Sequence, residues 1–180
     1  MEDTMDLEAV MKERHELLIK MMDSLQEGLI ACDIREAEKE NEPEILTVVL
    51  DGIGEAGEKE GGLGEFFFIP PATENDTVMH FCSVITLLDD LNREHLPDLF
   101  ELMSYINFRL PLGSYSVDRD ASLLCYRLVT PIPAVVTGDA LFSQMNVCMA
   151  NSLTSADLYA DMLIKVAGGE KTLEDVIDSI

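Results

Sequence analysis

The stretch Asn92–Pro133 constrains the fold of this 180-residue chain more than any other part of the sequence. Apolar residues at helical spacing predict a helix over Asn92–Arg109, with Asn92 as its N-cap. After Gly113, two short runs, Ser114–Asp118 and Ser122–Val129, have the composition of strands and are separated by a polar turn of hairpin length. A helix followed by a hairpin, with no long crossover, is typical of α+β folds.

The rest of the chain supplies further helices and three more strands. Helices are predicted where apolar residues recur three, four and seven positions apart, and strands where compact β-branched or aromatic runs stand between glycines and prolines. The predicted helices are Asp6–Gln26, Gly138–Ala167 with an interruption or kink at Asn151–Ser155, and Leu173–Ser179, and the predicted strands are Ile45–Leu50, Glu65–Ile69 and Thr77–Leu88. Leu29–Cys32 fits either a short strand or a continuation of the first helix. Pro131 and Pro133 are expected to end the last strand.

These elements follow the order α-β-β-β-α-β-β-α. A chain of 180 residues is long enough for one domain with a sizeable core, so we expect a single α+β domain over residues 1–180. Thr77–Leu88 is apolar on both faces, which predicts a central strand. Small α+β folds with this order bind other proteins more often than they catalyse reactions.

The net charge of -23, from 12 basic and 35 acidic residues, excludes several classes of partner. Such a chain repels phosphate backbones and anionic lipid surfaces, so we expect no binding to nucleic acid or membranes. Met1–Glu65 alone holds 19 acidic and 6 basic residues. This region is interpreted either as a solvated surface or as an electrostatic lure for a basic partner.

The sequence predicts a cytoplasmic protein. Its longest apolar runs fall far short of the roughly 20 residues that a membrane span needs, and the acidic N-terminus does not resemble a secretory signal. Cys32, Cys82, Cys125 and Cys148 are widely spaced and form no Cys-x-x-Cys pair. In such a chain we expect them to be reduced and at least half-buried.

The loop Gly52–Gly57 matches the pattern G-x-G-x-x-G of dinucleotide sites and follows a predicted strand. A pyrophosphate in such a site lies at the N-terminus of an amphipathic helix, but residues 58–64 are rich in glycine and too short for one. Glu55, Glu58 and Glu60 would also repel the phosphates. We therefore interpret the loop as a connection between antiparallel strands.

No other motif predicts chemistry. His15, His80 and His95 stand in no metal-ligand spacing, although a catalytic pair between Cys82 or Cys125 and His80 or His95 stays open. The turn Asp118-Arg119-Asp120 has too few ligands for a calcium loop. The ten methionines suit either an irregular core or an adaptable binding groove, and exposure of a patch with Phe66–Phe68 would favour the groove.

The run Ile106–Asp118 and the segment Leu123–Arg127 resemble the bacterial YbjN family, whose members look like type III secretion chaperones in fold. In that family an asparagine on the middle helix precedes a glycine, a short strand, a turn and a second strand that ends near a proline. The residues that match are Asn107, Gly113, Tyr126, Arg127 and Pro131. Ala156–Tyr159 is similar to the family's last helix, whereas the Gly52–Gly64 loop and the helix 173–179 depart from the pattern.

The resemblance implies an antiparallel sheet of about five strands with the helices packed largely on one face, often paired into a homodimer. It also implies a non-enzymatic, chaperone-like or regulatory module that binds another protein, with no catalytic, cofactor or metal residues to carry over. The alternative is a small-ligand sensor or an enzyme with a site assembled from distant residues, most plausibly around His80, His95 or Cys125. A third hypothesis is an acidic surface that mimics nucleic acid.

Overall fold

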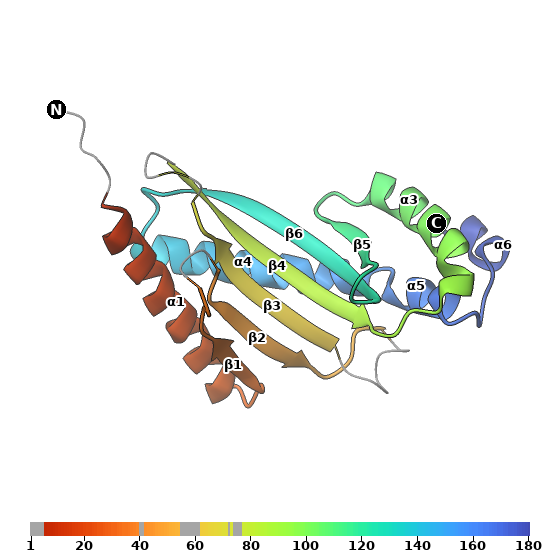
Figure 1. Cartoon of the computed structure of the whole chain (residues 1–180), viewed down its shortest axis with the longest axis horizontal. Coiled ribbons are helices and arrows are strands. Elements are labelled where there is room, and N and C mark those ends of the chain that lie inside the picture. The colour runs from red at the N-terminus through yellow and green to blue at the C-terminus, as the bar shows by residue number, and fades with distance from the viewer. Residues whose placement is uncertain (1–5, 40–41, 55–61, 72, 74–76) are drawn as a thin grey trace. The chain divides into compact units, whose positions relative to one another are not determined.

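The computed structural model describes residues 6–39, 42–54, 62–71, 73 and 77–180. It is an α+β protein with one antiparallel sheet of six strands in the order β1-β2-β3-β4-β6-β5 (Figure 1). The strands are β1 (Cys32–Arg35), β2 (Ile45–Leu50), β3 (Gly62–Ile69), β4 (Val78–Leu88), β5 (Ser114–Asp118) and β6 (Leu123–Pro133). The helices are α1 (Leu7–Glu27), η1 (Arg93–His95), α3 (Leu96–Arg109), α4 (Gly138–Asp157), α5 (Ala160–Ala167), α6 (Leu173–Val176) and η2 (Ile177–Ser179).

The predicted fold class is confirmed, with one strand more than expected. The additional strand, β1, is short and only half-buried, and it forms because β2 offers a partner in the register Cys32↔Val48 to Arg35↔Ile45. The sequence leaves Leu29–Cys32 open between a short strand and an extension of α1, and of that stretch only Cys32 belongs to β1. Four residues are too few for the alternation of apolar side chains to decide between these two.

The described chain divides into two compact units, each made of three segments. Unit 1 comprises Met1–Val48, Glu65–Ser83 and Val129–Ala150, and unit 2 comprises Val49–Gly64, Val84–Leu128 and Asn151–Ile180. Strands β2, β3, β4 and β6 and helix α4 contribute residues to both. The single domain predicted over residues 1–180 stays a prediction.

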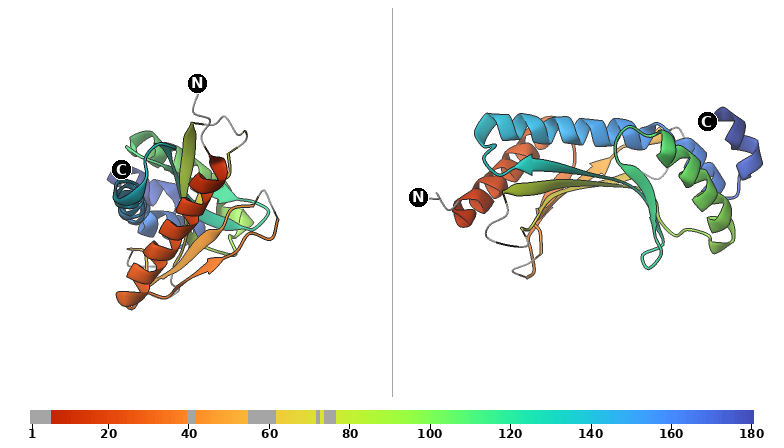
Figure 2. Two further views of the ribbon diagram at one scale, coloured as in Figure 1. Left: turned by 90° about the vertical axis from the view of Figure 1, so that its left-hand side faces the viewer. Right: turned by 90° about the horizontal axis from the view of Figure 1, so that it is seen from above.

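In unit 1 the strands bury one face. Leu46, Val48, Phe66, Phe68 and Phe81 are almost fully buried, whereas their neighbours along each strand are mostly half-buried or exposed. Helix α1 lies beside the first part of α4 (Figure 2), where Lys20 pairs with Asp139 at 3.2 Å. The buried face of the strands and the apolar stripe of α1 therefore belong to one core, as expected for amphipathic elements.

In unit 2, helices α3, α5 and α6 lie close together (Figure 1). The buried stripe of α3 is Leu99, Leu102, Met103 and Ile106, and α5 buries Ala160, Leu163, Val166 and Ala167. The short α6 begins with a capping box, in which Thr172 and Asp175 satisfy each other's backbone amides. The predicted helices at Asn92–Arg109 and Leu173–Ser179 are confirmed apart from their short 3-10 turns.

The helix predicted over Gly138–Ala167 breaks after Asp157, later than the expected interruption at Asn151–Ser155. The Tyr115 hydroxyl causes this break. It donates to the carbonyls of Ser155 (2.8 Å) and Ala156 (3.1 Å) and accepts from the Tyr159 N–H (3.3 Å). In an uninterrupted helix that N–H would reach the Ser155 carbonyl, so the inserted hydroxyl replaces a helical hydrogen bond.

Strand β6 continues through Pro131 to Pro133, four residues past the predicted end at Val129. The register between β5 and β6 ends at the pair Ser114↔Arg127. Beyond Arg127, the edge of β6 that faces β5 has no neighbouring strand. A proline there lacks an N–H but gives up no hydrogen bond to another strand. The strand therefore tolerates both prolines.

Candidate functional site

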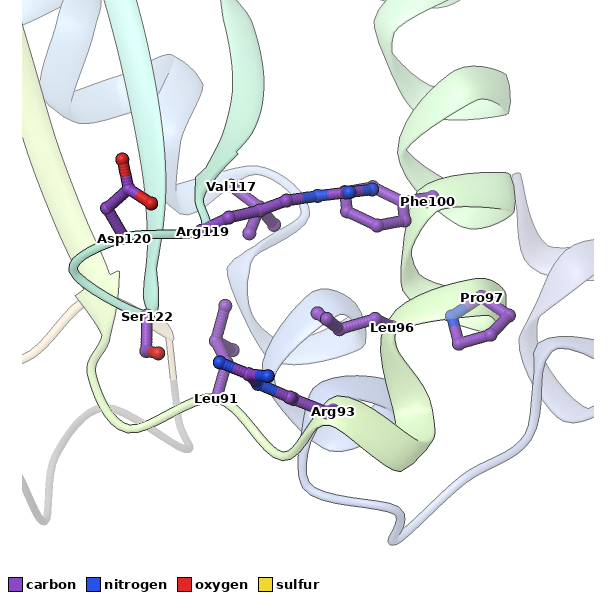
Figure 3. A pocket seen from close by; sticks show the side chains of 9 residues that line it. All are labelled: Leu91, Arg93, Leu96, Pro97, Phe100, Val117, Arg119, Asp120 and Ser122. Carbon is purple, nitrogen blue, oxygen red and sulfur yellow. The ribbon is translucent and has the colours of Figure 1, made fainter.

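A pocket of about 480 Å³ lies in unit 2 between the β5–β6 turn and the start of α3 (Figure 3). All of its residues come from one continuous segment, residues 91–122. Its apolar residues are Leu91, Leu96, Pro97, Phe100 and Val117, and its polar residues are Arg93, Arg119, Asp120 and Ser122. The pocket is therefore an apolar floor with a few polar groups, the usual composition of a binding site.

Two tight turns form one wall of this pocket. The Asp118 carboxylate accepts hydrogen bonds from the backbone N–H groups of Asp120 (2.9 Å) and Ala121 (3.0 Å), which shapes the β5–β6 turn. Asp90 and Ser122 have φ values of 55° and 57°, in the left-handed region that side chains other than glycine rarely adopt. The Leu91 N–H donates to the Ser122 carbonyl at 3.2 Å and joins the two turns. Such strain persists only where surrounding contacts hold it.

Helix α3 forms the opposite wall. The Asn92 side chain accepts a hydrogen bond from the Glu94 N–H at 3.1 Å, so the predicted N-cap is confirmed, and Pro97 lies in the first turn of α3, where proline is tolerated. The helix buries its central stripe in the core of unit 2. Leu96 and Phe100, which stand beside that stripe, stay half-buried and line the pocket.

Two arginines give the pocket a local positive charge. The Arg119 guanidinium lies over the Phe100 ring, with 4.9 Å from its central carbon to the ring centroid. Arg93 extends from the 3-10 turn toward Leu91 (Figure 3). In the described part of the chain, neither arginine has a carboxylate within 4.0 Å. An exposed guanidinium without a carboxylate partner is free to bind an anionic group.

Ser122 is the one hydroxyl and Asp120 the one carboxylate among the residues that line the pocket. A serine nucleophile needs a base within hydrogen-bond reach, and in the segments that the structure describes Ser122 has no such bond. Neither histidine nor cysteine is among the lining residues. A search of the described residues finds no group of three or more histidine, cysteine or acidic side chains that could hold a metal ion.

A second pocket, of about 280 Å³, lies in unit 1 and includes Arg14, which is only 1% exposed. The Arg14 guanidinium donates to the carbonyls of Val136 (3.0 Å) and Ala134 (3.4 Å) and lies 5.5 Å from the centroid of Phe68. Burial lowers the pKa of Arg14, and the adjacent Glu13 carboxylate raises it. These contacts hold α1 against the loop after β6. They give the buried Arg14 side chain a structural role. Sequence reasoning overlooked it, although its spacing from Val10, Leu17 and Leu18 places it on the apolar stripe of α1.

The histidines and cysteines considered as candidate catalytic residues lie on α1, β1, β4, η1, β6 and α4. His80 is exposed on β4, and His95 packs against Gly169, where an added Cβ would meet its ring. His15 pairs with Glu44 at 2.7 Å beside the Arg14 pocket. Cys82, Cys125 and Cys148 are buried, and Cys32 is half-buried with its pKa raised by burial and by Asp33 and Asp23. A raised pKa opposes nucleophilic chemistry at Cys32.

The glycine loop has an acid where a nucleotide site would place a phosphate. Gly52 and Gly54 adopt φ values of 97° and 67°, and the Gly54 N–H donates to the Asp157 carboxylate at 2.6 Å. An added Cβ on Gly54 would collide with the Asp161 carboxylate. This loop is therefore fastened to the α4–α5 junction of unit 2. Residues 55–61 of the motif lie outside the described residues.

Three of the residues that carry the YbjN resemblance, Asn107, Gly113 and Tyr126, build a structural joint in unit 2. The Asn107 amide accepts from the Tyr115 N–H (2.8 Å) and donates to the Tyr115 carbonyl (3.0 Å), so it occupies the edge of β5 as a neighbouring strand would. Gly113 has φ 62°, and an added Cβ would collide with the Tyr126 hydroxyl, which donates to the Leu112 carbonyl at 2.8 Å. Burial raises the pKa values of Tyr115 and Tyr126. These residues position β5 and do not form a site.

The methionines favour the core interpretation. Met21, Met79, Met103, Met145 and Met149 are buried, and the three other described methionines are half-buried. Phe66 and Phe68 are buried as well. The exposed patch that would have favoured a methionine-rich groove is therefore not present in the described residues. The large apolar side chains that are exposed on unit 2 include Tyr105 (42%) and Phe108 (89%) of α3.

No protein-family model matches the chain, and no curated protein matches it either. Membership of the YbjN family therefore stays a prediction. None of the described helices is long and apolar enough to cross a membrane. The pocket residues Arg93, Leu96, Phe100 and Arg119 had no signal in the sequence, because the turns that bring them together depend on backbone conformations that local patterns do not predict.

Proposed function

We propose that the protein is a non-enzymatic module of the cytoplasm that binds another protein, in a chaperone-like or regulatory role. The unit 2 pocket receives an apolar side chain of the partner. The observation that carries this proposal is the pocket itself, in which five apolar residues lie beside two arginines. Phe108 and Tyr105 on the same helix add exposed apolar surface, which is common at binding sites.

Binding in the pocket fits the structure better than addition of a strand to the sheet. On β5 the outward backbone groups of Tyr115 are already taken by Asn107. On β1 the Cys32 carbonyl accepts from the Gln26 side chain at 3.1 Å, and the Ile34 N–H donates to the Asp33 carboxylate at 2.9 Å. Side chains therefore blunt both outer strands, as in proteins that avoid edge pairing.

Selection from a random peptide library displayed on phage tests this proposal. The immobilised full-length protein should enrich peptides that share an apolar position, and Leu96→Gln should abolish this enrichment because it places an amide in the apolar floor. Leu158→Gln is the matched control, because Leu158 is 62% exposed and does not line the pocket. An L96Q pool identical to the wild-type pool would refute binding in this pocket. The homodimer implied by the resemblance is tested separately by analytical ultracentrifugation.

A further inference from the structure

We infer that the unit 2 pocket selects a partner segment in which an acidic residue stands beside an apolar residue. This inference rests on the proposed function and names the chemistry of the ligand. The apolar side chain occupies the floor made by Leu96, Phe100 and Val117, and the carboxylate binds the Arg119 guanidinium, with Arg93 as a second cation of the same pocket.

The distribution of charge carries this inference. With 35 acidic and only 12 basic residues, an arginine of this chain has many potential carboxylate partners. Arg14 and Arg35 have one, whereas the four arginines between residues 93 and 127 have none within 4.0 Å in the described part of the chain. Of these four, Arg93 and Arg119 line the same pocket. The pocket therefore offers local positive charge on a protein with a net charge of -23.

The nearby acids do not neutralise the two guanidinium groups. One oxygen of the Asp118 carboxylate accepts from the backbone amides of Asp120 and Ala121, and in the described residues this carboxylate makes no ion pair within 4.0 Å with Arg93 or Arg119. Asp120 lines the pocket, but its carboxylate lies beyond ion-pair distance of Arg93 and Arg119 and points away from the Arg119 guanidinium (Figure 3). Among the described residues no carboxylate pairs with these two arginines, so we assign the anion to the ligand.

The geometry of Arg119 favours a carboxylate. Its guanidinium reaches from the turn to the Phe100 ring, and stacking on the ring leaves the N–H groups at the edge of the guanidinium for an acceptor. This planar fork matches the two oxygens of a carboxylate. A polyanion such as nucleic acid would meet the repulsion of the whole chain, whereas a single carboxylate reaches the arginines at short range. At about 0.15 M salt, repulsion beyond roughly 8 Å is screened.

The phage selection, repeated with arginine variants at 0.15 M salt, tests the inference. The variant is R93Q/R119Q, and the control is R109Q/R127Q, which makes the same change in net charge at two exposed arginines outside the pocket. We expect wild-type and control pools to enrich acidic residues next to the apolar position about 10-fold over the R93Q/R119Q pool. One wild-type peptide and its Glu→Gln analogue are then compared by fluorescence anisotropy. The analogue should bind wild type about 10-fold more weakly and bind R93Q/R119Q as well as the parent peptide does.

The outcomes separate the inference from the proposed function. An apolar position that depends on Leu96 but carries no adjacent acid, or carries lysine or arginine, would overturn the inference and leave the proposed function intact. Equal acidic enrichment with R93Q/R119Q and with wild type would also overturn it. Pools from wild type and L96Q that do not differ would refute the proposed function itself.

Discussion

Replacing Asn107 by aspartate tests whether its side chain caps the edge of β5. In the wild type the amide makes two hydrogen bonds with the Tyr115 backbone, at 2.8 and 3.0 Å. The introduced carboxylate still accepts from the Tyr115 N–H, but its second oxygen faces the Tyr115 carbonyl. A hydrogen bond is lost and a half-buried acceptor is left without a donor. We therefore expect the free energy of unfolding to fall by about 2 kcal/mol at pH 7.5.

The pH dependence of this penalty identifies its cause. The carbonyl opposes the ionised form, so the folded pKa of the introduced carboxyl rises above its unfolded value of about 3.9. A penalty of about 2 kcal/mol corresponds to a rise of about 1.5 pKa units. The penalty is therefore absent below the unfolded pKa and develops as pH rises through the folded pKa. Linkage gives a penalty of about 1.3 kcal/mol at pH 5.0, still above the sequence pI of about 4.1.

Urea unfolding followed by circular dichroism measures the penalties at pH 7.5 and at pH 5.0, each as the difference in the free energy of unfolding from wild type at the same pH. Asn107→Ala should cost about 1–3 kcal/mol at either pH, because it removes both hydrogen bonds and introduces no charge. Asn146→Asp is the matched control, since Asn146 is exposed and its amide donates to Phe142 of its own helix. A penalty for N107D that does not change with pH, or that is no larger than the penalty for N146D, would refute the role given to Asn107.

Two further substitutions test the packing of each unit. Gly113→Ala should destabilise the protein by more than about 2 kcal/mol, because φ is 62° and the added Cβ would collide with the Tyr126 hydroxyl. Gly138→Ala is the control: φ is 58° but no atom lies within 4 Å of the added Cβ, so it should cost about 1 kcal/mol or less. Equal losses of stability in thermal denaturation would contradict this account. Arg14→Met should lower the free energy of unfolding measured in urea by about 1–3 kcal/mol, because the carbonyls of Ala134 and Val136 in unit 1 lose a charged donor. A more stable variant would show that the cost of desolvating the guanidinium outweighs those hydrogen bonds.

Local patterns predicted most of the elements. The strands Ile45–Leu50 and Ser114–Asp118 have the predicted bounds, and the caps Asn92 and Thr172 begin their helices as expected. These features are determined by residues within a few positions of each other, through side-chain alternation and the capping of free N–H groups. Such signals are complete in the sequence itself.

The errors arose where a distant residue decides the local structure. The break between α4 and α5 depends on Tyr115, about 40 positions away, whose hydroxyl takes the place of a helical hydrogen bond. β6 extends through its prolines because β5 ends earlier. The candidate site was missed for the same reason, since Arg93 and Arg119 are 26 positions apart and come to line one pocket only through the turns at Asp90 and Ser122.

The sequence by itself therefore determined an acidic α+β protein with a central β4. Periodicity depends only on residues close together in the chain, and net charge is a sum over all residues, so neither needs tertiary contacts. Only the tertiary structure decided which side chains meet. It showed that the match Asn107-Gly113-Tyr126 is a joint that fixes β5, because the amide and the hydroxyl bind backbone groups across that joint. It also showed a pocket lined by two arginines that have no carboxylate partner among the described residues, because ion pairing depends on distances that the order of residues does not contain.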